Sequence, residues 1–238
     1  MKKSLLMLLC LMLAFNCFAQ DVKSLDQEKG FYIYLKGANV EITEEEYLNY
    51  AKVLQKSTYD KYINDPFEWD EQYAKLKVKF DEAIKDADLD STYTISTNVD
   101  FTDYDFTNAG YKVEIGEGVF FPLGEFYYGY KSSSDSLFQK EVAFSLHDLH
   151  KYNFFAMEKE EAKTFLQGRK DRYGDINKGI MLVINYKIAN YSSDEYKAFA
   201  NLALNNNYLP VVGIIQNIEV YDTSNKKNIK KLGDLIQK

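Results

Sequence analysis

Both cysteines of this chain, Cys10 and Cys17, lie within its first twenty residues. That segment, MKKSLLMLLCLMLAFNCFAQ, has the parts of a secretory signal peptide: two lysines, an apolar run, and short residues before a cleavage site. Cleavage after Ala19 would leave a mature chain with no thiol and no disulfide. An exported fold of this length must then be stabilised by its apolar core, because no cross-link constrains the unfolded chain.

A lipid anchor is the alternative outcome of processing. The residues Ala14-Phe15-Asn16-Cys17 have the position of a lipoprotein acylation box, in which Cys17 becomes the lipidated first residue. Asn16 is unusual before such a cysteine, whereas Phe18-Ala19-Gln20 forms an ordinary cleavage site. We predict that residues 1–19 are a signal peptide and that the protein is exported. Its expected location is the periplasm, the cell surface or the medium into which it is secreted. Membrane association is expected only if Cys17 is lipidated.

The chain is acidic, with a formal net charge of −7. Removal of Lys2 and Lys3 with the leader, which contains no acid, makes that charge −9. Nucleic acids and anionic membranes are bound through basic surfaces, so we expect no nucleic-acid partner. A mature chain without cysteine also has no thiolate nucleophile, no zinc–thiolate cluster and no iron–sulfur centre.

The first part of the mature chain combines a strand pattern with helical patterns. Residues 21–30 are polar and are expected to form a loose leader. Phe31 to Leu35 then read as a short buried strand, ended by Gly37.

A helical hairpin is predicted over about residues 44–86. Thr43 to Glu46 read as a capping box, which opens a helix running to about Tyr62. A second helix is predicted from Phe67 to about Asp86, with Asp65 as its cap and Pro66 at its first position. Its apolar residues recur every three or four positions, as on one helix face: Trp69, Tyr73, Leu76, Phe80, Ala83 and Ala87.

Alternation of apolar and polar residues predicts strands in the rest of the chain. Tyr93 to Phe101 alternate in this way, and a turn at Asn108 to Gly110 leads into a strand from Tyr111 to Ile115. The glycine-punctuated aromatic stretch 116–130 is predicted to form twisted strands, and 131–136 a loop. Further strands are predicted at 141–146, 179–188 and 209–221, and helices at 157–168 and from the capping box Ser192–Glu195 to Asn205.

Together these patterns predict an α+β fold: an N-terminal helical hairpin packed with a mostly antiparallel sheet, followed by a C-terminal helix–strand–helix–strand. Strand order stays open, because the last strands fit either parallel or antiparallel pairing. We find no repeat and no proline- or glycine-rich linker. Residues 20–238 are therefore predicted to form a single α+β domain, with the hairpin of about 44–86 as its lobe.

Two histidines, His147 and His150, are the only ones in the chain. Three positions apart on a helix, they could share one metal ion with Glu158 or Glu161. The alternative is two polar residues where a strand leaves the sheet, because a pair alone does not complete the three or four ligands that zinc needs. The metal-binding residues stay unknown, and we predict no catalytic and no cofactor-binding residues.

Two acidic stretches resemble the start of a calcium-binding loop. In the first, Asp86, Asp88 and Asp90 alternate after a helix, but Ser91 and Thr97 stand where glycine and glutamate are expected. In the second stretch, the ligand positions are occupied by Asp103, Asp105, Thr107 and Glu114. Asn108 stands where the glycine is expected. We interpret both as solvated aspartates at a helix end and in a hairpin.

An aromatic stretch offers rings on which sugars could stack: Phe120, Phe121, Phe126, Tyr127, Tyr128 and Tyr130. Core and cross-strand pairing is the alternative use of such rings. The chain has no Gly-x-Ser-x-Gly nucleophile motif and no glycine-rich phosphate loop. Whether the protein is an enzyme stays open, and the absence of these motifs favours a protein without catalytic activity.

The stretch FAMEKEEAKTFLQGRKD at 155–171, with GIMLVINYKI and IIQNIEVYD after it, resembles uncharacterised exported domains of unknown function from Gram-negative bacteria. The resemblance implies a compartment and no activity. We expect an exported binding or interaction module of the bacterial envelope, whose partner is an unknown protein or glycan. The alternatives are a hydrolase of envelope or dietary polymers and a structural subunit of an envelope assembly.

Overall fold

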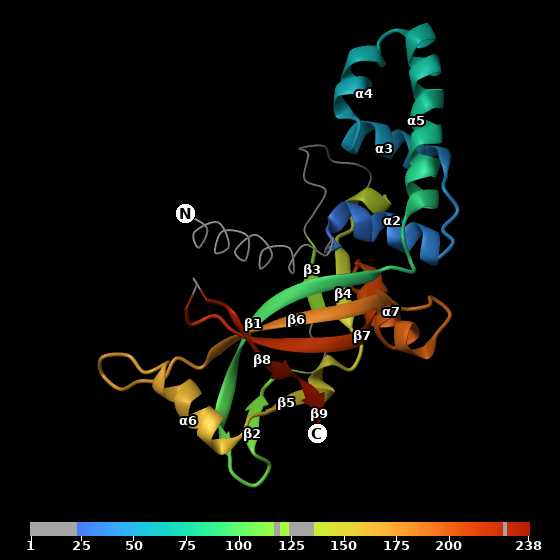
Figure 1. The fold of residues 1–238 in the computed structure, drawn as a ribbon. Helices are drawn as coiled ribbons and strands as arrows, with labels where there is room; N and C mark the ends of the chain where they lie inside the picture. The colour runs from blue at the N-terminus through green and yellow to red at the C-terminus, as the bar shows by residue number, and fades with distance from the viewer. Residues whose placement is uncertain (1–22, 117–119, 124–135, 226–227) are drawn as a thin grey trace, which may run out of the picture.

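The computed structural model describes residues 23–116, 120–123, 136–225 and 228–238 (Figure 1). The predicted signal peptide, both cysteines and the rings of Phe126, Tyr127, Tyr128 and Tyr130 lie outside these residues. In the described part, six α-helices accompany a nine-stranded, mostly antiparallel sheet, so the α+β prediction is confirmed. None of these helices is both long and apolar enough to cross a bilayer.

Helix α2, Gln27–Gly37, occupies the segment for which a leader and a strand are predicted. That prediction is wrong. Asp26 caps the helix by accepting a hydrogen bond from the Lys29 backbone N–H at 2.8 Å. Phe31 to Leu35 are buried as expected, but a short run that is apolar on every side carries no period to distinguish a helix from a strand.

Helices α3, Glu44–Val53, and α4, Lys56–Tyr62, replace the single helix predicted up to Tyr62. The chain breaks between them at Leu54 and Gln55. Helix α5, Pro66–Asp86, begins as predicted, with the Asp65 carboxylate accepting from the N–H groups of its first turn. We call α3, α4 and α5 the helical lobe. Figure 1 shows the lobe at one end of the molecule, with α2 between it and the sheet.

The sheet follows the order β3-β4-β7-β6-β1-β2-β5-β9, and β8 pairs with β7 outside that path. All ladders are antiparallel except the parallel pair of β4 and β7. The strands are β1 Thr92–Asp105, β2 Gly110–Val113, β3 Phe120–Pro122, β4 Val142–Leu146, β5 Tyr152–Ala156, β6 Gly179–Ile188, β7 Leu209–Asp222, β8 Lys230–Asp234 and β9 Ile236–Gln237. Helix α6 is Lys159–Gln167, α7 is Asp194–Asn205, and two 3-10 turns are η1 Leu137–Gln139 and η2 Leu149–Lys151.

The strand pairings, together with the chain connection between β8 and β9, form a ring. Strand β1 pairs with β6 from Thr92 to Asp100 and with β2 from Phe101 to Asp105, and this second ladder has an irregularity between Phe101 and Tyr104. Strand β2 pairs with β5, β5 with β9, β8 with β7, and β7 with β6. Because β8 and β9 are consecutive and join at the buried Leu235, they connect β5 to β7. Together these strands leave β3 and β4 as an extension of the sheet beyond β7.

The core is rich in tyrosine and phenylalanine. Inside the sheet, the Tyr186 ring lies 4.7 Å from Phe144 and 5.9 Å from Tyr93, between ring centroids. At the other end, α6 packs the Phe165 ring 5.3 Å from Phe101. Buried side chains of α2, α3, α5 and the sheet belong to one continuous cluster, so the lobe shares its packing with the sheet.

Arg169, just after α6, is the one fully buried ion-pair donor in the described residues. Its side chain is 0% exposed and donates to the Asp222 carboxylate at 2.6 Å. The guanidinium also donates to the backbone oxygens of Asn177 and Gly179, each at 2.7 Å, and lies 4.5 Å from the Phe165 ring centroid. These contacts fix the long connection between α6 and β6.

Helix α7 begins one residue later than the predicted capping box. Ser193, and not Ser192, is the cap, and its hydroxyl accepts from the Tyr196 N–H at 3.3 Å. Strands β6 and β7 on either side of this helix match the predicted 179–188 and 209–221, with an antiparallel pairing that the sequence leaves open.

Candidate functional site

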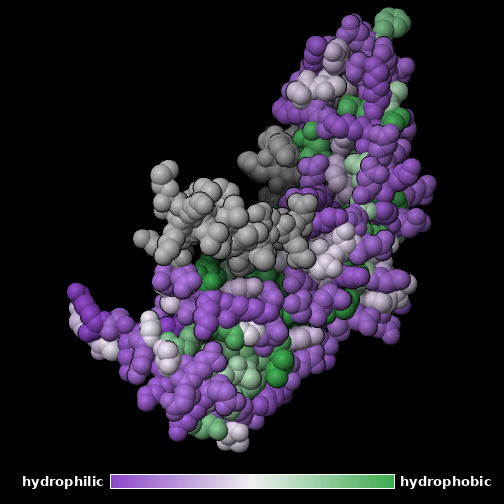
Figure 2. Space-filling model, in the orientation of Figure 1, coloured by the Kyte–Doolittle hydropathy of each residue, from purple (hydrophilic) through white to green (hydrophobic). Residues whose placement is uncertain are grey.

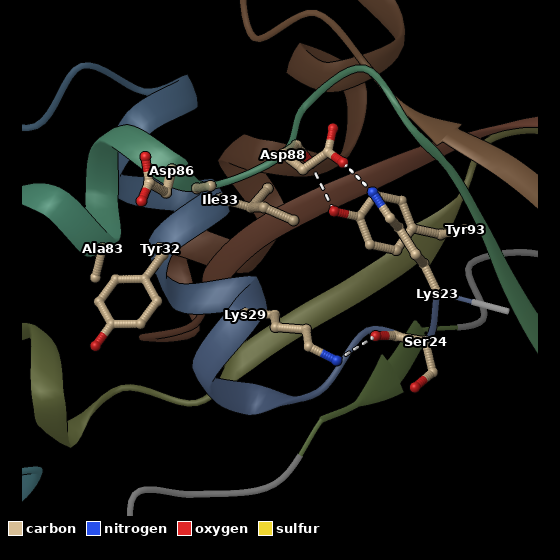
Figure 3. Close-up of a pocket in the computed structure, with 10 residues that line it drawn as sticks. Lys23, Ser24, Lys29, Tyr32, Ile33, Ala83, Asp86, Asp88 and Tyr93 are labelled. Carbon is tan, nitrogen blue, oxygen red and sulfur yellow. Dashed lines mark hydrogen bonds and ion pairs between the residues drawn. The ribbon is translucent and has the colours of Figure 1, made fainter. Parts of the chain in front are cut away.

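A cavity of about 320 Å³ lies where α2, the end of α5 and the start of β1 meet (Figure 3). We call it the junction pocket. Its apolar lining comes from Tyr32, Ile33, Ala83, Ala87 and Tyr93. Its polar lining comes from Lys23, Ser24, Lys29, Asp86 and Asp88.

Hydrogen bonds between distant parts of the chain hold the walls together. The Lys36 ammonium group of α2 donates to the backbone oxygens of Lys85, at 2.7 Å, and of Ala87. These carbonyl groups at the end of α5 have no partner within the helix, so a cation there satisfies them and complements the helix dipole. The end of α5 is thereby fixed against α2.

Lys23 closes one side of the pocket. Its ammonium group pairs with the Asp88 carboxylate and donates to the Ser91 hydroxyl at 2.7 Å, while its backbone oxygen accepts from the Thr94 N–H at 2.9 Å. The hydrogen bond from Lys23, followed by those from Ser91, holds the pKa of Asp88 well below its usual range. Asp88 is therefore ionised and its charge is compensated.

The two tyrosines supply rings whose hydroxyl groups are already used. The Tyr93 hydroxyl donates to the Asp88 backbone oxygen at 2.7 Å, and burial raises the pKa of Tyr93 to about 12. The Tyr32 hydroxyl donates to Glu28 at 3.2 Å, and burial raises its pKa far above the ordinary value. Both rings stay neutral at physiological pH and present apolar faces.

Asp86 differs from the other charged residues of the pocket. Lys29 donates to the Ser24 backbone oxygen at 3.1 Å and lies 3.2 Å from the Asp26 carboxylate. Asp86, the last residue of α5, is exposed, and its carboxylate has no hydrogen bond or ion pair with any described side chain. In Figure 3 its carboxylate lies on the side of Ala83 and Tyr32, apart from the Lys23–Asp88 pair.

The first acidic stretch that resembles a calcium loop is not assembled as one in the structure. Asp86, Asp88 and Asp90 follow one another as expected, but Asp88 faces Lys23 and accepts from the N–H groups of Asp90 and Ser91, at 3.1 and 2.9 Å. Over the described ranges, no group of three or more histidine, cysteine, aspartate or glutamate side chains is placed to hold a metal ion.

The second acidic stretch is a hairpin turn. Asp105 accepts from the N–H groups of Thr107 and Asn108, at 2.9 and 3.0 Å, and this fixes the turn between β1 and β2. Asp103 pairs with Lys178 at 2.8 Å. Glu114 lies beyond the end of β2. The interpretation of this stretch as a hairpin agrees with these contacts.

The histidine pair lies at the exit of β4. His147 lies 3.2 Å from the Asp148 carboxylate, which also pairs with Lys151 at 2.7 Å, and His150 belongs to η2. Glu158 precedes α6, and Glu161 lies 3.8 Å from Lys230. The described residues bring none of these carboxylates together with both imidazoles as a metal-binding group.

A buried polar cluster joins α3 to η1 and was not predicted. Thr43 caps α3 as expected, but Glu46 does not complete the capping box. Its carboxylate instead accepts from the Leu137 N–H at 3.0 Å and from the Ser136 hydroxyl at 3.3 Å. Asn49 donates to Ser136 at 3.0 Å. Burial raises the pKa of Glu46, although the bonds from Leu137 and Ser136 oppose this.

The aromatic stretch gives no complete surface in the described residues. The Phe120 side chain is 42% exposed and lies 5.7 Å from the Tyr208 ring, whereas Phe121 packs 6.1 Å from the buried Phe144. Figure 2 shows hydrophobic side chains only in small separate areas of the face that it presents. A sugar-binding platform therefore stays a prediction.

The pocket residues that sequence reasoning missed are Lys23, Lys29, Tyr32 and Tyr93. Lys23 and Lys29 fall in the segment taken for a loose leader, and Tyr32 in the strand predicted from Phe31 to Leu35. Lys23 and Asp88 are 65 positions apart, and no local pattern connects them.

Comparison with known proteins places these elements in a family. The model of a family described as Domain of unknown function (DUF4852) matches residues 43–168, from the cap of α3 to the end of α6. This confirms the resemblance to a domain of unknown function, although the match covers only residues 155–168 of the three stretches that suggested it. No curated protein and no solved structure matches the chain. Because the match covers more than half of its residues, the chain belongs to the DUF4852 family.

Proposed function

We propose that this protein is an exported binding module of the bacterial envelope, and that it holds a small, partly apolar ligand in the junction pocket. The observation that carries the proposal is the combination of an apolar lining with a polar rim in one preformed cavity. Ligand pockets of proteins are concave and mostly apolar, and begin at about 300 Å³. The cavity of about 320 Å³ suits a ligand of one or two rings or a short alkyl chain.

The pocket walls support this reading because they are held by contacts that do not involve a ligand. Lys36 fixes α5 to α2, and Lys23 fixes the chain before α2 to the start of β1. A site whose walls are already ordered loses little conformational entropy when a ligand binds.

A neutral fluorescent probe tests the proposal. N-phenyl-1-naphthylamine becomes bright in apolar surroundings, and we expect saturable binding to the purified protein. Ala83→Leu fills the pocket with a residue that a helix accepts readily, so binding should weaken by about tenfold or more. Ala74→Leu is the matched control, because Ala74 is an exposed residue of the same helix that lines a separate, open hollow and not the junction pocket.

Two outcomes would overturn the proposal. One is the absence of saturable probe binding to the parent protein. The other is equal binding by Ala83→Leu and Ala74→Leu, because the probe would then occupy another surface. Circular dichroism of both variants shows that the helices are retained.

Export is the second half of the proposal, and it rests on the leader sequence. An intact-mass measurement of protein recovered from the envelope of an expressing bacterium separates the two processing outcomes. A mass beginning at Gln20 supports release after Ala19, and a mass beginning at Cys17 with added acyl chains supports the lipid anchor. A retained residue 1 would contradict export.

A further inference from the structure

We infer that the ligand of the junction pocket is uncharged: an apolar ring or short chain that carries at most a hydroxyl or similar neutral group. This inference rests on the proposed function and adds the chemical class of the ligand. It comes from the apolar floor of the pocket and from the partners that its charged side chains already have.

The floor of the pocket is apolar, and it is formed by the buried residues Tyr32, Ile33 and Tyr93. The Tyr32 hydroxyl group donates to Glu28. The Tyr93 hydroxyl group donates to the backbone oxygen of Asp88. Neither hydroxyl group therefore has a proton left to donate to an anion. A charge brought to this floor would lose its water without gaining a hydrogen-bonded partner, which is unfavourable.

The charged side chains of the pocket reach solvent, and the two lysines of the lining each lie beside a carboxylate. Lys23 pairs with Asp88 and donates to the Ser91 hydroxyl group at 2.7 Å. Lys29 lies 3.2 Å from the Asp26 carboxylate. An ion that entered the pocket would have to compete with these pairs, whereas a neutral ligand leaves them intact.

The end of α5 is balanced as well. Asp86 is exposed there, and the Lys36 ammonium group is held on the backbone oxygens on either side of it, those of Lys85, at 2.7 Å, and of Ala87. The positive charge of Lys36 offsets the charge of this carboxylate and the negative end of the helix dipole. Among the described residues, the pocket thus keeps no excess charge of either sign that would select an ion.

Three probes with one ring system separate charge from apolar contact: 1-naphthalenemethanol, 1-naphthalenemethylamine and 1-naphthoate. At neutral pH they are uncharged, positive and negative, and each is measured by displacement of N-phenyl-1-naphthylamine. We expect the alcohol to bind at least about fivefold more tightly than either ion, because an ion loses water at a floor that gives it no partner. The amine is the more demanding comparison, because the tyrosine rings and the net charge of −7 both favour a cation over an anion.

Dividing the Lys23–Asp88 pair should give the pocket a preference for an ion. Lys23→Met leaves the Asp88 carboxylate uncompensated, so the amine should gain about threefold in affinity relative to the alcohol. Asp88→Asn leaves the Lys23 ammonium group uncompensated, so 1-naphthoate should gain instead. The matched controls are Lys75→Met and Glu71→Gln, which divide an exposed ion pair of α5 that does not line the pocket. Neither control should change the relative affinities of the three probes.

The outcomes distinguish this inference from the proposed function. If the parent protein bound the amine or 1-naphthoate more tightly than the alcohol, the uncharged class would be overturned and the pocket would remain a binding site. Relative affinities that stay the same in both Lys23→Met and Asp88→Asn would overturn it too, as would a bound N-phenyl-1-naphthylamine that none of the three probes displaces. Absence of saturable N-phenyl-1-naphthylamine binding would overturn both the class and the proposed function.

Discussion

The helical lobe and the sheet bury their side chains in different ways. In the sheet, all five residues of β4 are buried, and alternate residues of β6 are buried along its whole length. In the lobe, α4 has no buried residue, and the 21 residues of α5 include only two, Leu76 and Phe80. Burial is thus shared along β4 and β6, whereas α4 and α5 bury only Leu76 and Phe80; α3, the third helix of the lobe, buries five of its ten residues.

Phe80 is the residue on which the lobe depends most. Its ring is fully buried and stacks on Tyr50 with centroids 4.5 Å apart. It also contacts rings from three other elements, with centroids between 5.8 and 6.0 Å away: Tyr32, Tyr47 and Phe138. A region that buries a single large ring at its centre is therefore more sensitive to one substitution than a region in which many residues share the burial.

The largest effect is expected for Phe80→Ala. Removing this ring should lower the free energy of unfolding by about 4 kcal/mol, through lost burial and the cavity left behind. Trp69 is the only tryptophan of the chain and lies in α5, so its fluorescence follows the lobe during urea unfolding. Phe67→Ala is the control, because Phe67 is 89% exposed and its removal should cost about 0.5 kcal/mol or less. Equal effects of the two substitutions would contradict the dependence on Phe80.

Arg169→Ala is the corresponding test at the sheet. This substitution leaves the Asp222 carboxylate without its ion-pair partner and removes the hydrogen-bond donor of two backbone oxygens. We therefore expect the free energy of unfolding to fall by about 3 kcal/mol. Far-UV circular dichroism during urea unfolding follows the loss of secondary structure of the whole fold. Lys178→Ala removes an ion pair whose aspartate is 96% exposed and should change stability by about 0.5 kcal/mol or less. A small effect of Arg169→Ala would show that the sheet end does not need its buried ion pair.

Smaller effects are expected for tyrosine hydroxyl groups. Those of Tyr186 and Tyr191 are buried and have no hydrogen-bond partner among the described residues. Tyr186→Phe should therefore leave the stability unchanged or raise it by about 1 kcal/mol, because no hydrogen bond is lost. Tyr93→Phe should lower it by about 1 kcal/mol, since that hydroxyl donates to Asp88. Equal losses in both variants, measured by urea unfolding, would show that the Tyr186 hydroxyl is bonded.

The smallest effect is a pH dependence of the stability, which arises where Glu46 of the helical lobe contacts η1. Burial raises the pKa of Glu46 in the folded protein, so the folded state holds a proton more tightly than the unfolded state. Stability should therefore fall as the pH rises through the unfolded and then the folded pKa. Glu46→Gln removes this contribution, so the variant should gain stability relative to the parent as the pH rises above the ordinary glutamate pKa of about 4.3. Glu41→Gln, in the exposed chain before α3, should show no such gain, and a parallel pH profile for Glu46→Gln would contradict the assignment.

The periodicity of apolar residues predicted the helices and strands that keep one face against the core along their whole length. Helix α5 has one apolar face, and β1, β6 and β7 lie against the core, so their patterns appear in the sequence. The prediction failed at α2, whose central residues are buried on every side, and between α3 and α4, where no glycine or proline marks the break. In both places packing with distant elements determines the local structure.

The pocket was harder to predict than the fold. Asp86 and Asp88 were noticed because their alternation after a helix resembles the start of a calcium loop, and they were interpreted as solvated aspartates at a helix end. Whether a carboxylate meets a metal ion or a lysine depends on what the fold brings to it. Lys23 is brought to Asp88 from 65 positions away, and that encounter requires the complete arrangement of α2, α5 and β1.

The ring of strands has a consequence for the order of synthesis. Residues 230–237, which connect β5 to β7, are made after every other strand of the ring. Until then, β5 and β7 present unpaired backbone groups that could join with another chain. Completion of the ring thus waits until the last strands, β8 and β9, have left the ribosome.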